Sequence, residues 1–191
     1  MTDRPDPRGR LQLGLLAAIF FGPLAVAAWL YYQGGDLQPE GRANHGVLLE
    51  PYVNVDTDVD GAPLAALHDG AWLLLYAYDG PCEADCREGL YTTRQMRLML
   101  GREMDRLGRI FLHGPEAPDT VFLAAEHEGL VALQDGGLAD LIGTKTPASA
   151  LPGGYYLIDP IGNLVMYFPP DLAPKDIVAD LKRLLKLSRI G

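Results

Sequence analysis

A long run without charge divides this chain into two unequal parts. No Asp, Glu, Lys or Arg occurs between Leu11 and Tyr32. At 1.5 Å rise per residue, a helix over this run would span roughly the 30 Å hydrocarbon core of a bilayer. Pro23 would kink a helix in water, but membrane helices tolerate proline. The run therefore predicts one N-terminal transmembrane helix at 11–32, preceded by a short segment at 1–10.

The residues that flank the run predict its orientation. Arg4, Arg8 and Arg10 precede it, and its aromatic end includes Tyr31 and Tyr32. Because basic residues stay on the cytoplasmic side, the N-terminus is expected in the cytoplasm and the C-terminal domain outside. In a Gram-negative cell this is a single-pass protein of the inner membrane with a periplasmic domain.

A cleaved signal peptide is the alternative interpretation of the same run. The triplet Ala25-Val26-Ala27 resembles a signal-peptidase cleavage site. The length of the run and its aromatic end favour a retained anchor.

The net charge excludes one class of partner. The chain carries a formal charge of −9. Three arginines against two aspartates give residues 1–10 a charge of +1, which leaves −10 for the remainder. An acidic domain of this kind is not expected to bind nucleic acid. Basic partners, cations or simple solubility remain as explanations of the charge.

Periodic patterns indicate one globular domain at 46–191, joined to the anchor by a Gly-rich, polar tether at 33–45. Strands are expected at 47–49, 52–55, 72–78, 109–113, 130–133, 155–158 and 164–168. Helices are expected at 86–107, 119–127 and 174–187, with helical turns at 64–67 and 137–142. Strands that alternate with helices, followed by a hairpin and a last helix, predict an α/β domain with a mixed sheet.

The only two cysteines stand where a buried strand gives way to a helix. The apolar run 72–78 leads into the break Asp79-Gly80-Pro81, and Cys82 and Cys86 follow. Backbone N–H groups and the positive end of a helix stabilise a thiolate, which favours a reactive Cys82. If the helix begins at Cys82, Cys86 lies one turn further on the same face.

Two thiols so placed allow three kinds of chemistry. They can exchange with a client disulfide, clamp a soft ion such as Cu(I), or form a structural disulfide. The nearby charges are mixed, since Glu83, Asp85 and Glu88 oppose a thiolate while Arg87 favours it. A bridge over so few residues closes little chain entropy, which argues against a purely structural role.

Several features combine into a resemblance that covers residues 46–187. They are the anchor, the Asp60–Leu64 turn, the Cys82-x3-Cys86 spacing, and the blocks Tyr155–Gly162 and Tyr167–Pro170. Together they resemble the Sco/SenC family of membrane-anchored copper chaperones and thiol reductases. The resemblance implies a thioredoxin-like, three-layer α/β/α fold with a mixed central sheet. It also implies a role in assembling the copper centre of cytochrome c oxidase.

Three positions depart from that family's pattern. The family has proline after each cysteine, where this chain has Glu83 and Arg87. The family's third copper ligand is a histidine, and the matching position here is Leu151. With a gap of one residue, Pro152 would take the place of the cis-proline that packs against the cysteines in thioredoxin-like oxidoreductases. These departures favour thiol–disulfide exchange over copper binding.

The four histidines give one further candidate ligand. His113 ends a strand at the sheet edge where the cysteines are expected, so it is the candidate third copper ligand or proton shuttle. His45 in the tether and His68 in a turn are expected to be solvated. His127 is expected on the surface at a helix end.

Three methionines, Met96, Met99 and Met104, could suggest a soft-metal stripe. Their spacing is that of one helix face, so the sequence favours a place in the apolar core.

Three hypotheses about function follow. In the first, the protein is a thiol–disulfide oxidoreductase in which Cys82 attacks and Cys86 resolves, and its client is a cytochrome c oxidase subunit or another envelope thiol protein. In the second, it is a Cu(I) metallochaperone that uses both sulfurs. In the third, it is a non-catalytic assembly module with a structural disulfide.

Overall fold

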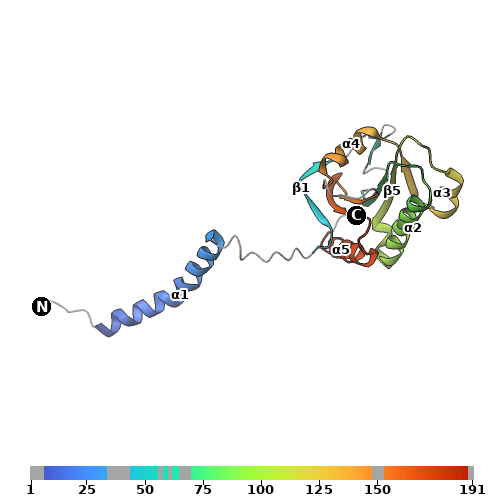
Figure 1. Cartoon of the computed structure of the whole chain (residues 1–191). Helices are drawn as coiled ribbons and strands as arrows, with labels where there is room; N and C mark the ends of the chain where they lie inside the picture. The colour runs from blue at the N-terminus through green and yellow to red at the C-terminus, as the bar shows by residue number, and fades with distance from the viewer. Residues whose placement is uncertain are drawn as a thin grey trace. The chain divides into compact units, whose positions relative to one another are not determined.

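The computed structural model describes residues 7–33, 44–55, 58–59, 62–64, 70–147 and 153–188 (Figure 1). They belong to two compact units, and the boundary between the units in the sequence follows Ala43. The predicted turn at Asp60-Gly61 and the histidine His68 lie outside the described residues.

The first unit holds one long helix, α1, from Pro7 to Gln33. Its apolar side chains are exposed on all sides, and Pro23 lies inside it without ending it. Within the described residues, the stretch Arg8–Leu30 is long and apolar enough to cross a membrane, judged by length and composition. A helix that is apolar all round needs either a protein core or lipid around it, so α1 supports membrane anchoring.

The second unit is built on a six-stranded sheet with the order β1-β8-β7-β4-β5-β6. β4, β5 and β6 are parallel, whereas β7, β8 and β1 pair antiparallel on the other side of β4. Its strands are β1 Val47–Asn54, β4 Trp72–Tyr78, β5 Leu107–His113, β6 Leu130–Leu133, β7 Tyr155–Ile158 and β8 Asn163–Phe168. The helices are α2 Ala84–Met99, α3 Thr120–Glu126, α4 Gly136–Lys145 and α5 Pro174–Leu187. Two short strands, β2 Asp58–Val59 and β3 Ala62–Pro63, form a separate pair.

Helices cover both faces of this sheet. Leu74 and Tyr76 of β4 point into one apolar cluster, which also contains buried side chains of α2, α3 and α5. Leu73 and Leu75 point into a second cluster, to which α4 contributes. The result is three layers, α/β/α, around a mixed sheet (Figure 1). The predicted thioredoxin-like fold class is confirmed.

Two predicted element boundaries are wrong. The helix expected to run to Leu107 ends at Met99, because Gly101 adopts a φ of 62° and a 3-10 helix, Gly101–Arg106, follows. A positive φ is a conformation that glycine reaches easily and that ends an α-helix. The strands expected at 47–49 and 52–55 are one strand, β1, with an irregular register in its middle.

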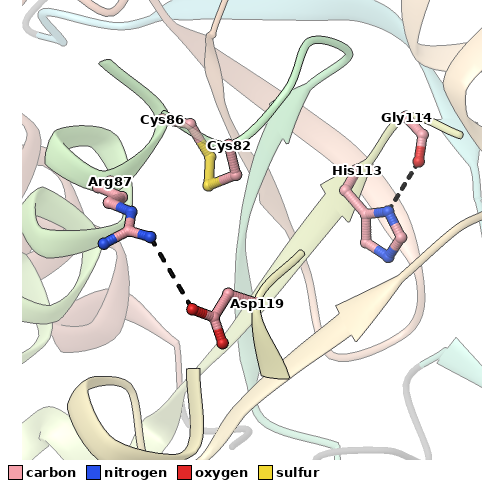
Figure 2. Close-up of a disulfide and its surroundings, with 6 residues drawn as sticks. All are labelled: Cys82, Cys86, Arg87, His113, Gly114 and Asp119. Atoms are coloured by element: carbon pink, nitrogen blue, oxygen red, sulfur yellow. Dashed lines mark hydrogen bonds and ion pairs between the residues drawn. A yellow bond between two sulfur atoms is a disulfide. The ribbon is translucent and has the colours of Figure 1, made fainter. Parts of the chain in front are cut away.

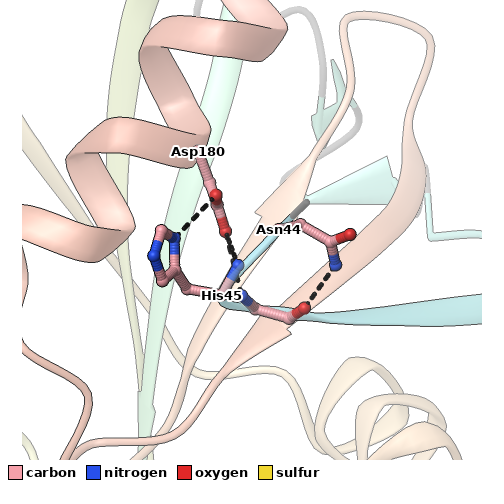
Figure 3. Close-up of polar contacts among 4 residues, drawn as sticks. Asn44, His45 and Asp180 are labelled. Atoms are coloured by element: carbon pink, nitrogen blue, oxygen red, sulfur yellow. Dashed lines mark hydrogen bonds and ion pairs between the residues drawn. The ribbon is translucent and has the colours of Figure 1, made fainter. Parts of the chain in front are cut away.

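A buried carboxylate holds the start of the second unit against its last helix (Figure 3). Asp180 of α5 is 3% exposed, and its Oδ2 accepts the backbone N–H of His45 at 2.7 Å and of Gly46 at 2.9 Å. The His45 ring Nδ1 lies 3.1 Å from Asp180 Oδ1. The prediction that His45 belongs to the tether is therefore wrong, because Asp180 holds its backbone and ring. Its side chain is nevertheless 47% exposed, as expected of a solvated residue.

We expect Asp180→Ala to lower the free energy of unfolding by about 1–3 kcal/mol, because two N–H groups lose their acceptor in a buried place. Urea denaturation of the purified protein, followed by the fluorescence of buried Trp72, measures this loss. The control is Asp140→Ala on an exposed position of α4, where the change should stay within about 0.5 kcal/mol. Equal losses in the two variants would contradict the role given to Asp180.

Candidate functional site

The two cysteines are joined by a disulfide at the start of α2 (Figure 2). Their Cα atoms are 4.9 Å apart. The helix begins at Ala84, so Cys82 precedes it and Cys86 lies in its first turn. The condition for placing both cysteines on one helix face, a helix that begins at Cys82, is therefore not met, although the disulfide still places their sulfurs together.

The two sulfurs differ in exposure. Cys86 is 0% exposed and packs in the core cluster with Tyr76 and Leu90. Cys82 is only partly buried and contacts that cluster from outside. An incoming thiol can therefore reach Cys82 more easily than Cys86.

One basic side chain stands beside the disulfide on the first turn of α2. The Arg87 guanidinium lies over the Phe122 ring, 4.4 Å from its centroid. It also lies 4.0 Å from the Asp119 carboxylate (Figure 2). Asp119 also caps α3 by accepting backbone N–H groups of that helix. Arg87 thus links α2 to α3 next to the cysteines, although half of its side chain is exposed and the ion pair is screened by solvent.

A cluster of aromatic side chains packs in the core on the side of Cys86. The Tyr76 ring stacks near Tyr78 and Phe111 and tilts against Tyr155. Burial, with Tyr155, Tyr78 and Asp85 as further causes, raises the pKa of the Tyr76 hydroxyl well above its usual value. This hydroxyl therefore stays protonated at neutral pH, and the cluster acts as packing rather than as a base.

Gly89 lets α2 approach this cluster closely. A Cβ at that position would overlap the ring and hydroxyl of Tyr76. Glycine is thus required here by space, since the backbone conformation of Gly89 is helical.

The loop before β7 also reaches this cluster. Gly153 has a φ of 81°, and a Cβ there would meet the Tyr76 hydroxyl at 3.3 Å and the Tyr78 ring at 3.2 Å. Gly154 accepts a hydrogen bond from the Ala77 N–H at 3.1 Å. Leu151 and Pro152 lie outside the described residues, so the supporting role predicted for Pro152 remains a proposal.

His113 lies beside Tyr78 in the register of β4 and β5. Its ring Nδ1 donates to the Gly114 carbonyl at 2.8 Å, and Figure 2 shows the ring directed to that carbonyl and away from the two sulfurs. In the part of the chain that the structure describes, no group of three His, Cys, Asp or Glu side chains could hold a metal ion. The structure therefore does not bring His113 together with Cys82 and Cys86 as ligands.

Two other expectations about single residues are wrong. His127 is 3% exposed rather than on the surface. Met99 is 44% exposed rather than in the core, whereas Met96 is fully buried and Met104 packs against the core edge. Met99 is the last residue of α2, but it does not belong to the buried face of that helix, which runs from Cys86 through Leu90 to Met96.

A cavity of about 760 Å³ opens at the α4 side of the same sheet edge. Tyr78, His113 and Gly153, which border the cysteine region, also line it, together with Asp135 and Tyr156. The loops at the carboxyl ends of β4 and β5 therefore border both the cavity and the region of the disulfide.

We expect Gly89→Ala to lower the free energy of unfolding by about 1–3 kcal/mol, because the added methyl group overpacks the Tyr76 ring. Chemical denaturation measures the loss, and Tyr76→Phe in the same background should recover part of it. Gly143→Ala is the matched control, since a Cβ on α4 there meets no atom within 4 Å. Alanine should stabilise α4 by up to about 1 kcal/mol. A loss in both variants would mean that Tyr76 is not the cause.

Comparisons with known proteins were made for sequence and for structure. A family model described as transmembrane-like, thioredoxin-like, C-terminal domain matches residues 72–188, and a transmembrane-like, N-terminal domain model matches residues 3–34. A search of curated proteins gave no significant match.

Solved Sco structures share the fold at low sequence identity. Apo Sco1 from Thermus thermophilus has a TM-score of 0.56 at 19% identity, over 74% of this chain and 96% of that one. Yeast Sco1 with copper bound has 0.52 at 16% identity, over 76% and 90%. Arabidopsis thaliana ScoI with copper bound has 0.50 at 14%, over 76% and 99%. The first family model runs from β4 to the end of α5, so this chain belongs to the transmembrane-like, thioredoxin-like family and has the Sco type of thioredoxin fold.

Proposed function

We propose that this protein is a membrane-anchored thiol–disulfide exchange protein that acts through Cys82 and Cys86 in the periplasm. The observation that carries the proposal is the unequal exposure of the two bonded sulfurs, with Cys86 fully buried and Cys82 accessible. Exchange needs both properties. A client must reach the first sulfur, and the second must be held ready to resolve the mixed disulfide.

The reaction begins from the reduced protein. The Cys82 thiolate attacks one sulfur of a client disulfide, the client S–S bond breaks, and the client's other sulfur leaves as a thiolate that takes up a proton. The Cys86 thiol then loses its proton and attacks the Cys82 sulfur, which restores the Cys82–Cys86 bond and releases the second client thiol. Two electrons and two protons pass to the client. A dithiol protein of the cell envelope must then reduce the Cys82–Cys86 disulfide by supplying two electrons and two protons.

The N-terminus of α2 supports Cys82 as the attacking residue, although the charged side chains near it are mixed in sign. Cys82 lies just before the N-terminus of α2, where the helix dipole and unpaired N–H groups stabilise an anion. Arg87 adds a positive charge on the first turn, shared with Asp119 at 4.0 Å. Cys86 is buried in an apolar cluster, which disfavours its thiolate until Cys82 is engaged.

The inferred client is a cysteine pair of a cytochrome c oxidase subunit that must be reduced before it receives copper. The fold shared with Sco proteins and the apolar helix α1 support this inference. A domain anchored beside a membrane complex meets that complex at a high effective concentration. Other thiol proteins of the envelope would be reached in the same way.

We expect Cys86→Ser to accumulate a mixed disulfide at Cys82 when the protein is incubated with oxidised glutathione, because the resolving thiol is missing. Cys82→Ser should accumulate at least about tenfold less adduct, because the remaining thiol is buried. Intact-mass spectrometry counts the adducts. Equal labelling of both variants would remove the basis for assigning attack to Cys82.

The reduction potential separates exchange from a structural bridge. We expect a value between about −120 and −270 mV, the range of known exchange enzymes. Equilibration with glutathione or dithiothreitol buffers, followed by alkylation and mass spectrometry, measures it in the full-length protein. A potential below about −300 mV would mean that the bridge is structural.

Cu(I) transport is a second candidate, favoured by the adjacent positions of the two sulfurs. The yeast and Arabidopsis structures with the same fold have copper bound. Two thiolates can hold Cu(I) as cargo, since soft sulfur ligands select this ion. His113 does not complete the set, because its Nδ1 donates to Gly114 and its ring is directed away.

We expect the reduced protein to bind Cu(I) more weakly than a site with three ligands would, because only two sulfurs are in place. A competing chelator of intermediate affinity should therefore remove the Cu(I). Competition titration followed by the absorbance of the chelator measures this. His113→Ala should leave the result unchanged. Retention of one Cu(I) per chain, lost in Cys82→Ser and weakened in His113→Ala, would instead favour a metallochaperone.

A further inference from the structure

The cavity on the α4 side of the sheet is walled by the loops that follow β4, β5 and β6. Asp79 follows β4, His113 ends β5, and Asp135 follows β6. The Gly114 N–H donates to the Tyr78 carbonyl at 3.2 Å, which ties the first two loops together. A Cβ at Gly114 would overlap the backbone and side chain of Asp79, so these loops lie in direct contact. The wall that carries Asp79 and His113 is thus held in place.

Tyr78 stands between this cavity and the disulfide. It lines the cavity and also packs against the apolar cluster that holds Cys86. A Cβ at Gly80 would meet its ring at 3.1 Å, and a Cβ at Gly153 would meet it at 3.2 Å. The ring is therefore enclosed between the loop that leads to Cys82 and the loop before β7. Because Cys82 follows Tyr78 by four residues, their Cα atoms are at most about 14 Å apart.

The polar groups that line the cavity are mainly hydrogen-bond acceptors. The carboxylates of Asp79, Asp135 and Asp140 are among them, and no Lys or Arg is among the described residues of the lining. His113 Nδ1 donates to the Gly114 carbonyl, so Nε2 of the neutral ring is an acceptor (Figure 2). The lining is therefore negative in charge and poor in donors.

The hydroxyl of Tyr156, on the side of β7, follows the same rule. Thr146 Oγ1 donates its one proton to the Ile142 carbonyl at 2.8 Å. The Tyr156 hydroxyl lies 2.7 Å from that same oxygen, so it is the donor of this second pair. Its remaining hydrogen-bonding capacity is that of an acceptor. A ligand that matches this cavity brings positive charge and hydrogen-bond donors.

A basic side chain has these properties. Lysine offers three N–H donors, arginine offers five, and neither has an acceptor. A metal ion does not match, because within the described residues no three His, Cys, Asp or Glu side chains are grouped as ligands. The volume of about 760 Å³ also falls among pockets that hold organic ligands, which admits a side chain together with part of its backbone.

We propose that this cavity binds a lysine or arginine side chain of the client, about three or four residues from the client cysteine that Cys82 attacks. The inference rests on the proposed thiol exchange and names its substrate class, a disulfide flanked by a basic residue. An extended segment of that length covers roughly 10–14 Å, which is enough to pass Tyr78. The basic residue then holds the client sulfur beside Cys82 while the exchange proceeds.

The test compares disulfide-bonded peptides that differ at one position. Lysine, glutamine or glutamate stands about two to five residues from the attacked cysteine, on either side. The reduced full-length protein in detergent is mixed with each peptide and quenched by alkylation, and mass spectrometry follows formation of the Cys82–Cys86 bond. At the best position, lysine should react roughly fivefold faster than glutamine, as for one partly exposed ion pair, and glutamate more slowly. At 1 M sodium chloride the screening length is about 3 Å, so most of this difference should disappear.

Asparagine substitutions locate the preference in the cavity. In the double variant Asp79→Asn, Asp140→Asn, which changes the two exposed carboxylates, the ratio of the lysine rate to the glutamine rate should fall to within about twofold of one. Asp135 is kept, because it caps α4 by accepting the Leu138 N–H. Asp105→Asn is the matched control, since it removes the same charge from an 81% exposed side chain before the start of β5. Its ratio should equal that of the wild type.

Binding is measured separately from the reaction. A fluorescent peptide with serine in place of both cysteines cannot exchange, and its lysine form should bind the oxidised protein several-fold more tightly than its glutamine form, as measured by fluorescence polarisation. If no peptide exchanges, the proposed function fails, and equal binding of these two serine peptides would overturn the inference as well.

Other results would overturn the inference and leave thiol exchange in place. One is exchange whose rate does not depend on lysine at any position. Another is a full preference for lysine in the double variant. A third is binding of a free polyamine that competes with no peptide, which would make the cavity a site for a small cation instead.

Discussion

The burial of β4 on both faces is the constraint on which the rest of the domain depends. Its residues alternate between two apolar clusters, so helices must cover both sides of the sheet. On one side the Tyr76 ring fills the space under α2, and only a glycine at position 89 allows the helix to lie so close. Cys86 precedes Gly89 by about one turn of the same helix. The burial of Cys86 therefore follows from how closely α2 packs on Tyr76. The difference in solvent exposure between Cys82 and Cys86 follows from that burial.

The fold could be predicted where one periodic pattern coincided with one element. Residues 72–78 and 174–187 were expected as a strand and a helix, and they are β4 and α5. The end of α2 could not be predicted in the same way, because Leu100, Met104 and Leu107 continue the apolar spacing of a helix. A 3-10 helix has nearly the same spacing over one or two turns, so the pattern does not distinguish them. The signal against a continuous helix was Gly101.

The candidate site was predictable in identity but not in geometry. The cysteines stand out because the chain has two, and the strand-to-helix break before them marks a loop. The burial of Cys86, the stacking of Arg87 on Phe122 and the direction of the His113 ring depend on contacts between distant elements. Asp180 and His45 are 135 residues apart, and no local pattern relates them.

The contact between Asp180 and the start of β1 has a mechanical consequence. A pulling force that arrives along the chain before Asn44 is taken up by the two N–H bonds to Asp180 and by the ladder between β1 and β8. β8 and β7 then separate that ladder from β4 in the sheet order. A force on the chain before Asn44 therefore enters the domain at β1 and α5. The sheet passes it to β4 only through β8 and β7.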